Sequence, residues 1–131
     1  MRFMIIVKAT ADSESGAMPS ASLLAEMGAF HEQLARAGVL LDGAGLKASA
    51  LGWRVAIGND GTRRVHDAPF SEAKELIAGY TLIQVRSRDE AVEWSRRYPN
   101  PTLNGSACEI EVRQLFEAED FAPQSEGHPP C

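Results

Sequence analysis

The chain has 131 residues, of which 44% are hydrophobic and 24% charged, and its formal net charge is -5. This length and composition are typical of one globular domain with a single core, and they exclude a disordered or fibrous protein. The acidic balance opposes generic binding to nucleic acid or anionic lipid, because both need clustered lysine and arginine.

The sequence indicates neither a membrane segment nor a metal site. The apolar run at residues 3–7 is far shorter than the roughly 20 residues that cross a bilayer, and no cleavage-site pattern follows it. Cys108 and Cys131 lack the spacing of a zinc site, and a reducing cytosol disfavours pairing them. We therefore expect a cytoplasmic protein without a membrane partner, a metal or another cofactor, and no histidine is well placed for a haem.

The N-terminal third predicts a strand, a loop and a helix. Residues 2–9 form a β-branched and apolar run of strand length, and residues 10–19 are small and polar. Ser20 can cap a helix whose apolar positions recur every three or four residues, and Gly38 can end it. The apolar positions are Leu23, Met27, Phe30, Leu34 and Ala37.

From residue 39 to residue 65 the pattern changes to short runs broken by glycine, which predicts strands and hairpins. Asn59-Asp60-Gly61 is a strong turn signal between residues 54–57 and 62–65, because Asp-Gly tolerates the positive φ of a tight hairpin. After this hairpin, Ser71 can cap a short helix to about residue 78, and residues 80–86 predict another strand.

The C-terminal part predicts one more helix and one more strand. Ser87 and Glu90 match a capping box, and Pro99 and Pro101 end the helix that it opens. The last strand is predicted at residues 107–116. Residues 122–131, with three prolines, are expected to form a disordered tail after one domain of residues 1–121.

This order of elements predicts an α+β fold, a ferredoxin-like sandwich with an inserted β-hairpin. Two helices can cover only one face of the sheet. Strand alternation places a mixed set of side chains on the other face: Lys8, Tyr80, Gln84, Glu109, Glu111 and Arg113. The apolar residues Met4, Ile6, Leu82 and Leu115 lie among them, which suits a homodimer formed through this face.

Two interpretations of this mixed face remain open. Alternating glutamate and arginine on an antiparallel strand commonly form ion pairs on a solvated surface. If instead a second sheet covers the face, burial raises the pKa of one glutamate enough for general acid or base catalysis. Arg113 would then hold the other glutamate ionised or bind a substrate carboxylate.

The run from His66 to Tyr80 carries a family signature. Its centre, Asp67-Ala68-Pro69-Phe70, resembles the Asp-Gly-Pro-Phe motif for which the DGPF, or YCII-related, family is named. Residues 37–41, 70–80, 89–94 and 109–121 extend the similarity. The resemblance implies a ferredoxin-like fold, usually paired as a dimeric α+β barrel with a cleft near the sheet interface. Most members have no established activity, and some occur alongside extracytoplasmic-function sigma factors.

Two departures from the family pattern limit what the resemblance implies. Ala68 stands where the family motif has glycine, so a positive φ is not required there. Classical YCII-like proteins are associated with a histidine near the start of the first helix, paired with an aspartate, but residues 18–22 contain no histidine. The His/Asp chemistry of the wider superfamily is therefore not expected here.

The candidate catalytic residues are Asp67 and Glu111, each as a general base. The candidate ligand-binding residues are Lys74, Tyr80, Glu109, Arg113 and His31, with Lys74 and Arg113 as holders of an anion. A structural role stays open for the signature loop, where Asp67 can cap a turn and Gly79 can supply an unusual backbone angle. His31 lies beside the apolar stripe of its helix and can equally be a packed side chain.

The sequence thus predicts a small cytoplasmic homodimer that binds a small polar or anionic organic molecule. Cofactor-free proton transfer or lyase-type chemistry would suit such a site. The alternative is a non-catalytic regulatory or interaction module, linked to sigma-factor control. A water-poor cleft favours the first hypothesis, and a fully solvated charged face favours the second.

Overall fold

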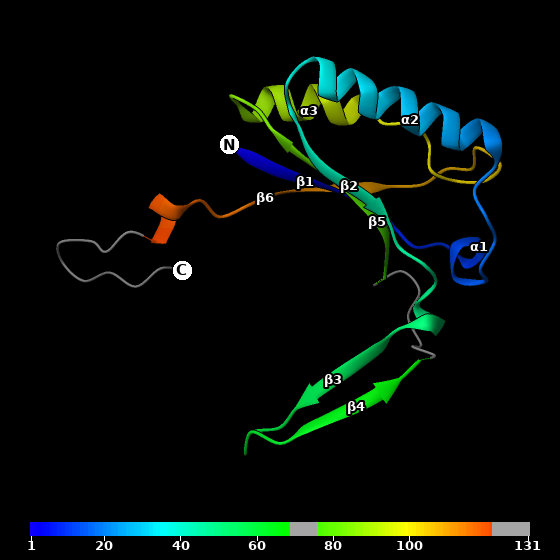
Figure 1. Cartoon of the computed structure of the whole chain (residues 1–131), viewed down its shortest axis with the longest axis vertical. Coiled ribbons are helices and arrows are strands. Elements are labelled where there is room, and N and C mark those ends of the chain that lie inside the picture. Colours follow the sequence, from blue (N-terminus) through cyan, green and yellow to red (C-terminus); the bar gives the residue numbers. More distant parts are fainter. Residues whose placement is uncertain (69–75, 122–131) are drawn as a thin grey trace.

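The computed structural model describes residues 1–68 and 76–121, and its centre is a four-stranded sheet (Figure 1). The strands are β1 (Arg2–Lys8), β2 (Leu40–Gly45), β5 (Ile77–Gln84) and β6 (Ile110–Gln114), in the order β2-β5-β1-β6. All neighbouring strands are antiparallel. Helices α2 (Ala21–Arg36) and α3 (Arg88–Arg96) lie on one face of this main sheet (Figure 1). The predicted ferredoxin-like α+β sandwich is confirmed.

The core lies between the main sheet and the two helices. Side chains of β1 alternate between buried and half-buried, as expected for a sheet that is covered on one face. The buried cluster comprises Phe3, Ile5, Phe30, Leu34, Val39, Ile83, Val85 and Ala91. Each large apolar side chain that is fully buried here contributes about 1.5–3 kcal/mol to stability.

Helix α2 begins and ends as the sequence predicts. The Ser20 hydroxyl accepts a hydrogen bond from the backbone N–H of Leu23 at 3.1 Å, and Gly38 adopts a positive φ of 74° just after the helix. The predicted cap of α3 is also present, since Ser87 accepts from the N–H of Glu90 at 3.2 Å. The Glu90 carboxylate accepts from the backbone of Arg86, one residue before the cap.

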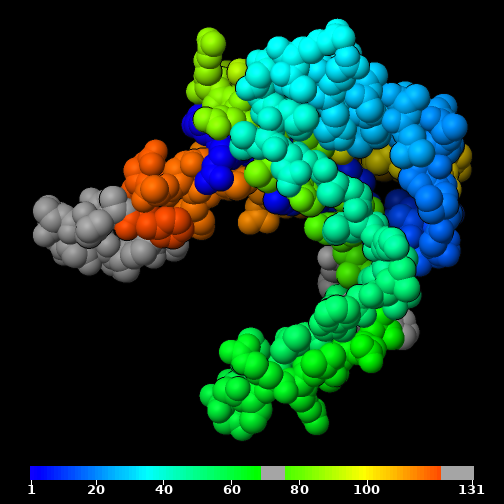
Figure 2. All heavy atoms as spheres, in the orientation of Figure 1, coloured from blue at the N-terminus to red at the C-terminus, as the bar shows by residue number. Residues whose placement is uncertain are grey.

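The inserted hairpin forms a second, two-stranded sheet from β3 (Trp53–Ile57) and β4 (Arg63–Asp67). Gly61 in the turn has a φ of 84°, which explains the glycine at that position. Figure 1 shows the hairpin beyond the sheet face that the helices leave open, and Figure 2 shows a wide hollow between it and the rest of the molecule. Every side chain of both strands is exposed.

Several boundaries differ from the sequence prediction. Residues 10–19, predicted as a loop, contain the short helix α1 (Ala11–Glu14), and two 3-10 turns, η1 (Ser49–Leu51) and η3 (Ala118–Phe121), were not foreseen. Ile77 and Ala78 belong to β5 and not to a helix, because their backbone groups join the sheet ladder and its continuation. The helix predicted from Ser71 and the predicted tail lie outside the described residues. In the described part of the chain, no helix is both long and apolar enough to span a bilayer.

Candidate functional site

A cavity of about 750 Å³ lies between the N-terminal half of α2 and one end of the main sheet. Its walls come from α1 and residues 16–19, from α2, from the end of β2 and residues 46–48, from the start of β5, and from residues 98–103. Most lining side chains are apolar, including Leu23, Met27, Leu46 and Leu103. A volume of this size is within the range of ligand pockets, roughly 300–1,000 Å³.

Three glycines line the cavity at this end of the sheet. Gly43 and Gly45 of β2 pair with Thr81 and Gly79 of β5, and cross-strand partners point to the same face of a sheet. The buried Thr81 belongs to the face that the helices cover, so the three glycines belong to that face as well. A Cβ atom at Gly45 would meet nothing within 4 Å. The missing side chain at Gly45 therefore leaves open space that belongs to the cavity.

Gly79 does not supply the unusual backbone angle that the sequence suggested for it. The described glycines with positive φ are Gly16, Gly38, Gly61 and Gly105. A Cβ atom at Gly79 would come within 2.9 Å of the Ala44 carbonyl oxygen. Glycine is needed there for the close approach of the neighbouring strand.

His31 of α2 lies in the cavity wall with both ring nitrogens hydrogen bonded. Nδ1 lies 2.9 Å from the carbonyl oxygen of Met27, and Nε2 lies 2.8 Å from Oγ1 of Thr81. A carbonyl oxygen can only accept, so Nδ1 carries a hydrogen and donates it. In the neutral imidazole Nε2 then accepts from the Thr81 hydroxyl. Gly43 makes room for this contact, since a Cβ atom there would lie 3.0 Å from Nε2.

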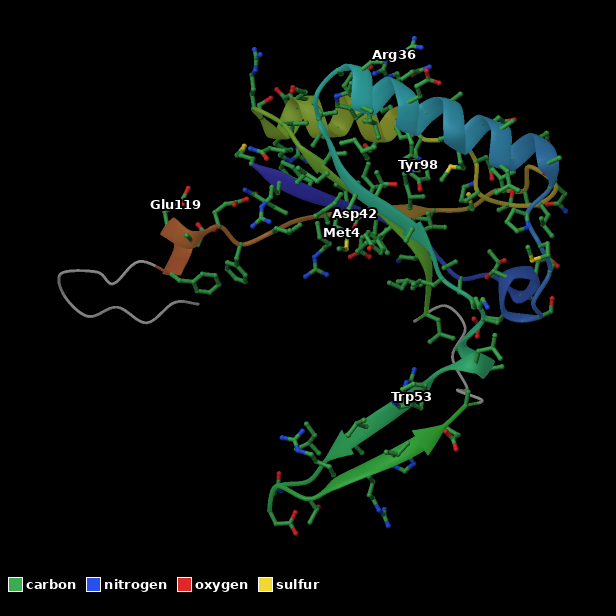
Figure 3. The ribbon with its side chains drawn as sticks, viewed as in Figure 1. Met4, Arg36, Asp42, Trp53, Tyr98 and Glu119 are labelled. Atoms are coloured by element: carbon green, nitrogen blue, oxygen red, sulfur yellow. The ribbon has the colours of Figure 1, made fainter. Side chains whose placement is uncertain are left out.

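Tyr98 extends this arrangement toward the cavity. Its hydroxyl lies 3.5 Å from Oγ1 of Thr81, and its ring packs edge-on against Phe30 with a centroid distance of 5.3 Å. Figure 3 shows Tyr98 between the helices and the sheet. Burial raises the pKa of the Tyr98 phenol, an effect that the hydrogen bond with Thr81 partly opposes, so the phenol stays protonated and can donate. We name Tyr98, Thr81 and His31 the hydroxyl–histidine triad.

Sequence reasoning identified His31 but missed its two partners. Thr81 is fully buried, and it stands between Gly79 and Ile83 on the apolar face of its strand. A polar residue at such a position must find a hydrogen-bond partner, and that requirement is the signal that could have found it. Tyr98 comes two residues after the end of α3, and nothing in the sequence indicates which residue its hydroxyl contacts.

A carboxylate links two of the short elements that border the cavity. Oε2 of Glu14, at the end of α1, accepts from the backbone N–H of Ser49 at 3.0 Å, and Oε1 accepts from the Ser49 hydroxyl. Hydrogen bonds from the Ser49 hydroxyl and backbone lower the pKa of Glu14. Ser13 and Ala48, the neighbours of these two residues, line the cavity. The Glu14–Ser49 link therefore holds part of the cavity rim together.

The mixed face of the main sheet carries the ion pairs that strand alternation predicts. Nζ of Lys8 lies 3.4 Å from carboxylate oxygens of both Glu109 and Glu111, and Nη1 of Arg113 lies 3.3 Å from Glu111. Hydrogen bonds from Arg113 and then Lys8 lower the pKa of Glu111, and the glutamates raise the pKa of Lys8. The side chains of Glu109 and Arg113 are 81% and 72% exposed. In the single chain this is a solvated ion cluster.

Among the remaining predicted site residues that the structure describes, Tyr80 is the one that lines the cavity. Asp67 is exposed at the end of β4 in the hairpin, and Lys74 lies outside the described residues. Tyr80 alternates with Gly79 and Thr81, so its side chain lies on the mixed face, where its hydroxyl donates to Oδ2 of Asp42 at 3.2 Å. The structure thus brings His31 and Tyr80 to the cavity and leaves Asp67, Glu109, Glu111 and Arg113 out of its walls.

Within residues 1–68 and 76–121, no three histidine, cysteine, aspartate or glutamate side chains lie close enough together to hold a metal ion. Cys108 is a free, exposed thiol. The candidate site is therefore the cavity with its hydroxyl–histidine triad.

Comparison with protein families gives a match to the YCII-related domain over residues 1–116. The chain belongs to the YCII-related domain family. An uncharacterised protein of Rhizobium meliloti (strain 1021), R00369, is 43% identical over 51 residues, which are 39% of this chain and 40% of that protein. The YCII-related chain thus matches less than half of the length of this curated relative.

Among solved structures, the YCII-related chain resembles a 5-chloro-2-hydroxyhydroquinone dehydrochlorinase from Burkholderia phenoliruptrix AC1100, in complex with 2,5-dihydroxybenzoquinone. The TM-score is 0.47 and the sequence identity 14%, over 91% of this chain and 97% of that chain.

Proposed function

We propose that the protein binds a small organic molecule in the cavity, with an apolar body and one oxygen-bearing group. The observation that carries this proposal is a mostly apolar cavity whose lining includes two polar side chains, His31 and Tyr98, joined through the buried Thr81 behind them. Ligand pockets typically combine an apolar lining with a few polar groups that orient the ligand. The sequence predicts a polar or anionic ligand. The apolar lining adds that the polar group is only one part of this ligand and that the rest of it is apolar.

The hydrogen bonds within the hydroxyl–histidine triad indicate whether a ligand oxygen would donate or accept a hydrogen bond. Thr81 has one hydrogen, which it donates to Nε2 of His31, so its oxygen is left to accept from Tyr98. The Tyr98 hydroxyl is a neutral donor and suits a carbonyl, phenolate or carboxylate oxygen. Such an oxygen would accept a hydrogen bond from the Tyr98 hydroxyl, whose contact with Thr81 is long, at 3.5 Å.

The same arrangement supports cofactor-free proton transfer as the finer hypothesis. A ligand hydroxyl gives its proton to Tyr98 as Tyr98 passes its own to Thr81 and Thr81 passes its own to Nε2 of His31. The products are a ligand oxyanion and an imidazolium whose Nδ1 still donates to Met27. His31 is the base in this scheme, in place of Asp67 or Glu111.

The roles that the sequence suggested for Asp67, Glu111, Lys74 and Arg113 stay predictions, as does a dimer formed through the mixed face. In the single chain, hydrogen bonds from Arg113 and then Lys8 lower the pKa of Glu111, which makes its carboxylate a weaker base. The regulatory alternative, with its link to sigma-factor control, likewise stays a prediction. Light scattering that shows only monomer at micromolar concentration would contradict the predicted dimer.

A thermal-shift series tests the binding site. Phenol, benzoate and cyclohexanol are compared with acetate and glycerol, which have the polar group without the apolar body. A ligand at 100 times its dissociation constant stabilises a protein by about 2.7 kcal/mol, which is a shift of several degrees. We expect the ring compounds to raise the melting temperature of the wild-type protein and the small polar compounds to leave it unchanged.

Three variants locate the response. Gly45→Leu fills open space in the cavity and should abolish the shift, whereas Gly28→Ala, at a helical glycine that also faces open space, should retain it. Tyr98→Phe removes only the hydroxyl and should weaken binding of benzoate more than binding of cyclohexanol. If the melting-temperature shift remains in Gly45→Leu but is lost in the double variant Glu111→Gln, Arg113→Ala, the ligand binds at the mixed face and not in the cavity.

A further inference from the structure

Part of the cavity wall consists of large apolar side chains that are exposed to solvent. They are Met18, Leu24, Leu46, Leu51 and Leu103. Met18 is 79% exposed and Leu51 69%. Single exposed apolar side chains are common on protein surfaces, but a group of them that lines one cavity marks a place where another molecule binds. We call these five residues the apolar rim.

The apolar rim and the hydroxyl–histidine triad lie at different ends of the cavity. Nε2 of His31 lies beside Gly43 of β2, and Leu46 follows three residues later, an extended span of about 10 Å. On the helix, Leu24 comes seven residues before His31, which is about 10 Å along the axis of α2. Figure 1 shows β2 running back along α2, so both steps lead away from the triad in the same direction.

The cavity is larger than the group that the triad can orient. A cavity of about 150 Å³ holds a benzene ring, whereas this one measures about 750 Å³. A single ring beside the triad therefore leaves most of the space unfilled. Among the described residues that line the cavity, the charged side chains besides His31 are Asp12 and Lys47. Their charges are opposite, so the cavity offers no net charge to a second ionic group of the ligand.

We propose that the ligand of the cavity is an elongated amphiphile, with its oxygen-bearing group at Tyr98 and a hydrocarbon tail that lies against the apolar rim. This inference rests on the proposed function and adds a second subsite to it. The tail covers side chains that are otherwise exposed to water, so it supplies binding free energy without a further polar contact. Each CH₂ group that is fully buried tightens binding by about fourfold.

A series of ligands with one head group and tails of increasing length tests the tail subsite. Benzoate, 4-ethylbenzoate, 4-butylbenzoate and 4-hexylbenzoate are titrated into the full-length protein by calorimetry, at concentrations where none of them aggregates. We expect the dissociation constant to fall with every added CH₂ group, by up to about fourfold each. Tyr98→Phe should raise all four constants by a similar factor, because it changes only the subsite of the head group.

Two double variants locate the tail. Met18→Ala with Leu24→Ala truncates the apolar rim and should reduce the gain of 4-hexylbenzoate over benzoate by about tenfold, with the affinity for benzoate unchanged. Ile57→Ala with Val65→Ala truncates similarly exposed side chains of the hairpin, which do not line the cavity, and should leave the gain as it is. Circular dichroism shows that each variant is folded.

The outcomes separate the tail subsite from the proposed function on which it rests. If benzoate binds and Gly45→Leu abolishes its binding, but neither tail length nor truncation of the rim has an effect, the proposed function stands and the amphiphile is overturned. A gain that both double variants reduce alike also overturns the amphiphile. If none of the four compounds binds, the proposed function fails, and the amphiphile fails with it.

Discussion

Helix α2 meets the main sheet in two different ways along its length. Its C-terminal half carries Phe30 and Leu34, which pack into the core cluster with Ile5 and Ile83. Its N-terminal half carries Met27, which faces the glycines of β2 and β5 across the cavity. One helix with one apolar stripe therefore builds a packed core at one end and a binding space at the other.

The difference arises in the strands and not in the helix. Opposite the packed half the sheet presents branched and aromatic side chains, and opposite the open half it presents Gly43, Gly45 and Gly79. A packed core gains stability from each contact, whereas a cavity gives up that stability in exchange for space. The comparison predicts that equal truncations have unequal effects along α2.

The largest expected effect is at the packed end. Leu34 is fully buried, and Leu34→Ala should lower the free energy of unfolding by about 2–5 kcal/mol, because it removes apolar contacts and leaves a new void. Met27→Ala, on the same helix, adds to a space that already exists and should lose clearly less. Urea unfolding of both variants measures the difference, and equal losses would show that the two halves of α2 are packed alike.

The sequence alone predicted α2 well, but it could not predict these two halves. The apolar stripe from Leu23 to Leu34 is continuous, and nothing in it distinguishes the residues that face side chains from those that face glycine. At Gly43 and Gly45 the sequence predicts breaks between short runs, because the register of these glycines with β5 is a long-range property. Pairing across the sheet, unlike helix periodicity, depends on which distant strand becomes the neighbour.

The same limit applies to the candidate site. The alternation of β6 correctly placed Glu109, Glu111 and Arg113 on one face with Lys8. The sequence predicts His31 as a candidate residue, but its partner Thr81 is distant in sequence and meets it only in the folded chain. A triad of this kind is assembled by tertiary structure, so the residues reveal it only after the register is known.

The next largest effect is expected at the boundary between the two halves of α2, where His31 meets Thr81. Thr81→Val keeps the shape of the side chain but leaves Nε2 of His31 without its hydrogen-bond donor, which should cost about 1–3 kcal/mol. Thr81→Ser keeps the hydroxyl and should lose less. If unfolding shows Thr81→Val to be as stable as the wild type, the 2.8 Å contact contributes no net stability, and the triad would lose its structural support.

The smallest effect is expected at the cavity rim, where Glu14 holds Ser49. The folded chain lowers the pKa of Glu14 below its usual value of 4.5, so the ionised carboxylate favours folding. This contribution is complete above the usual pKa and is lost as the pH falls through the lowered folded value. Glu14→Gln should therefore be slightly less stable than the wild type at neutral pH, and the difference should vanish in acid.

Urea unfolding of the wild type and Glu14→Gln from neutral pH to pH values below 4.5 measures this small difference. Glu111→Gln is the comparison, because Glu111 also has a lowered pKa but lies outside the cavity walls. Only Glu14→Gln should also weaken binding of a ring compound, since it loosens the link between α1 and η1 beside the cavity. If both variants lose stability alike and neither changes binding, the Glu14–Ser49 link stabilises the fold without shaping the cavity beside the N-terminal half of α2.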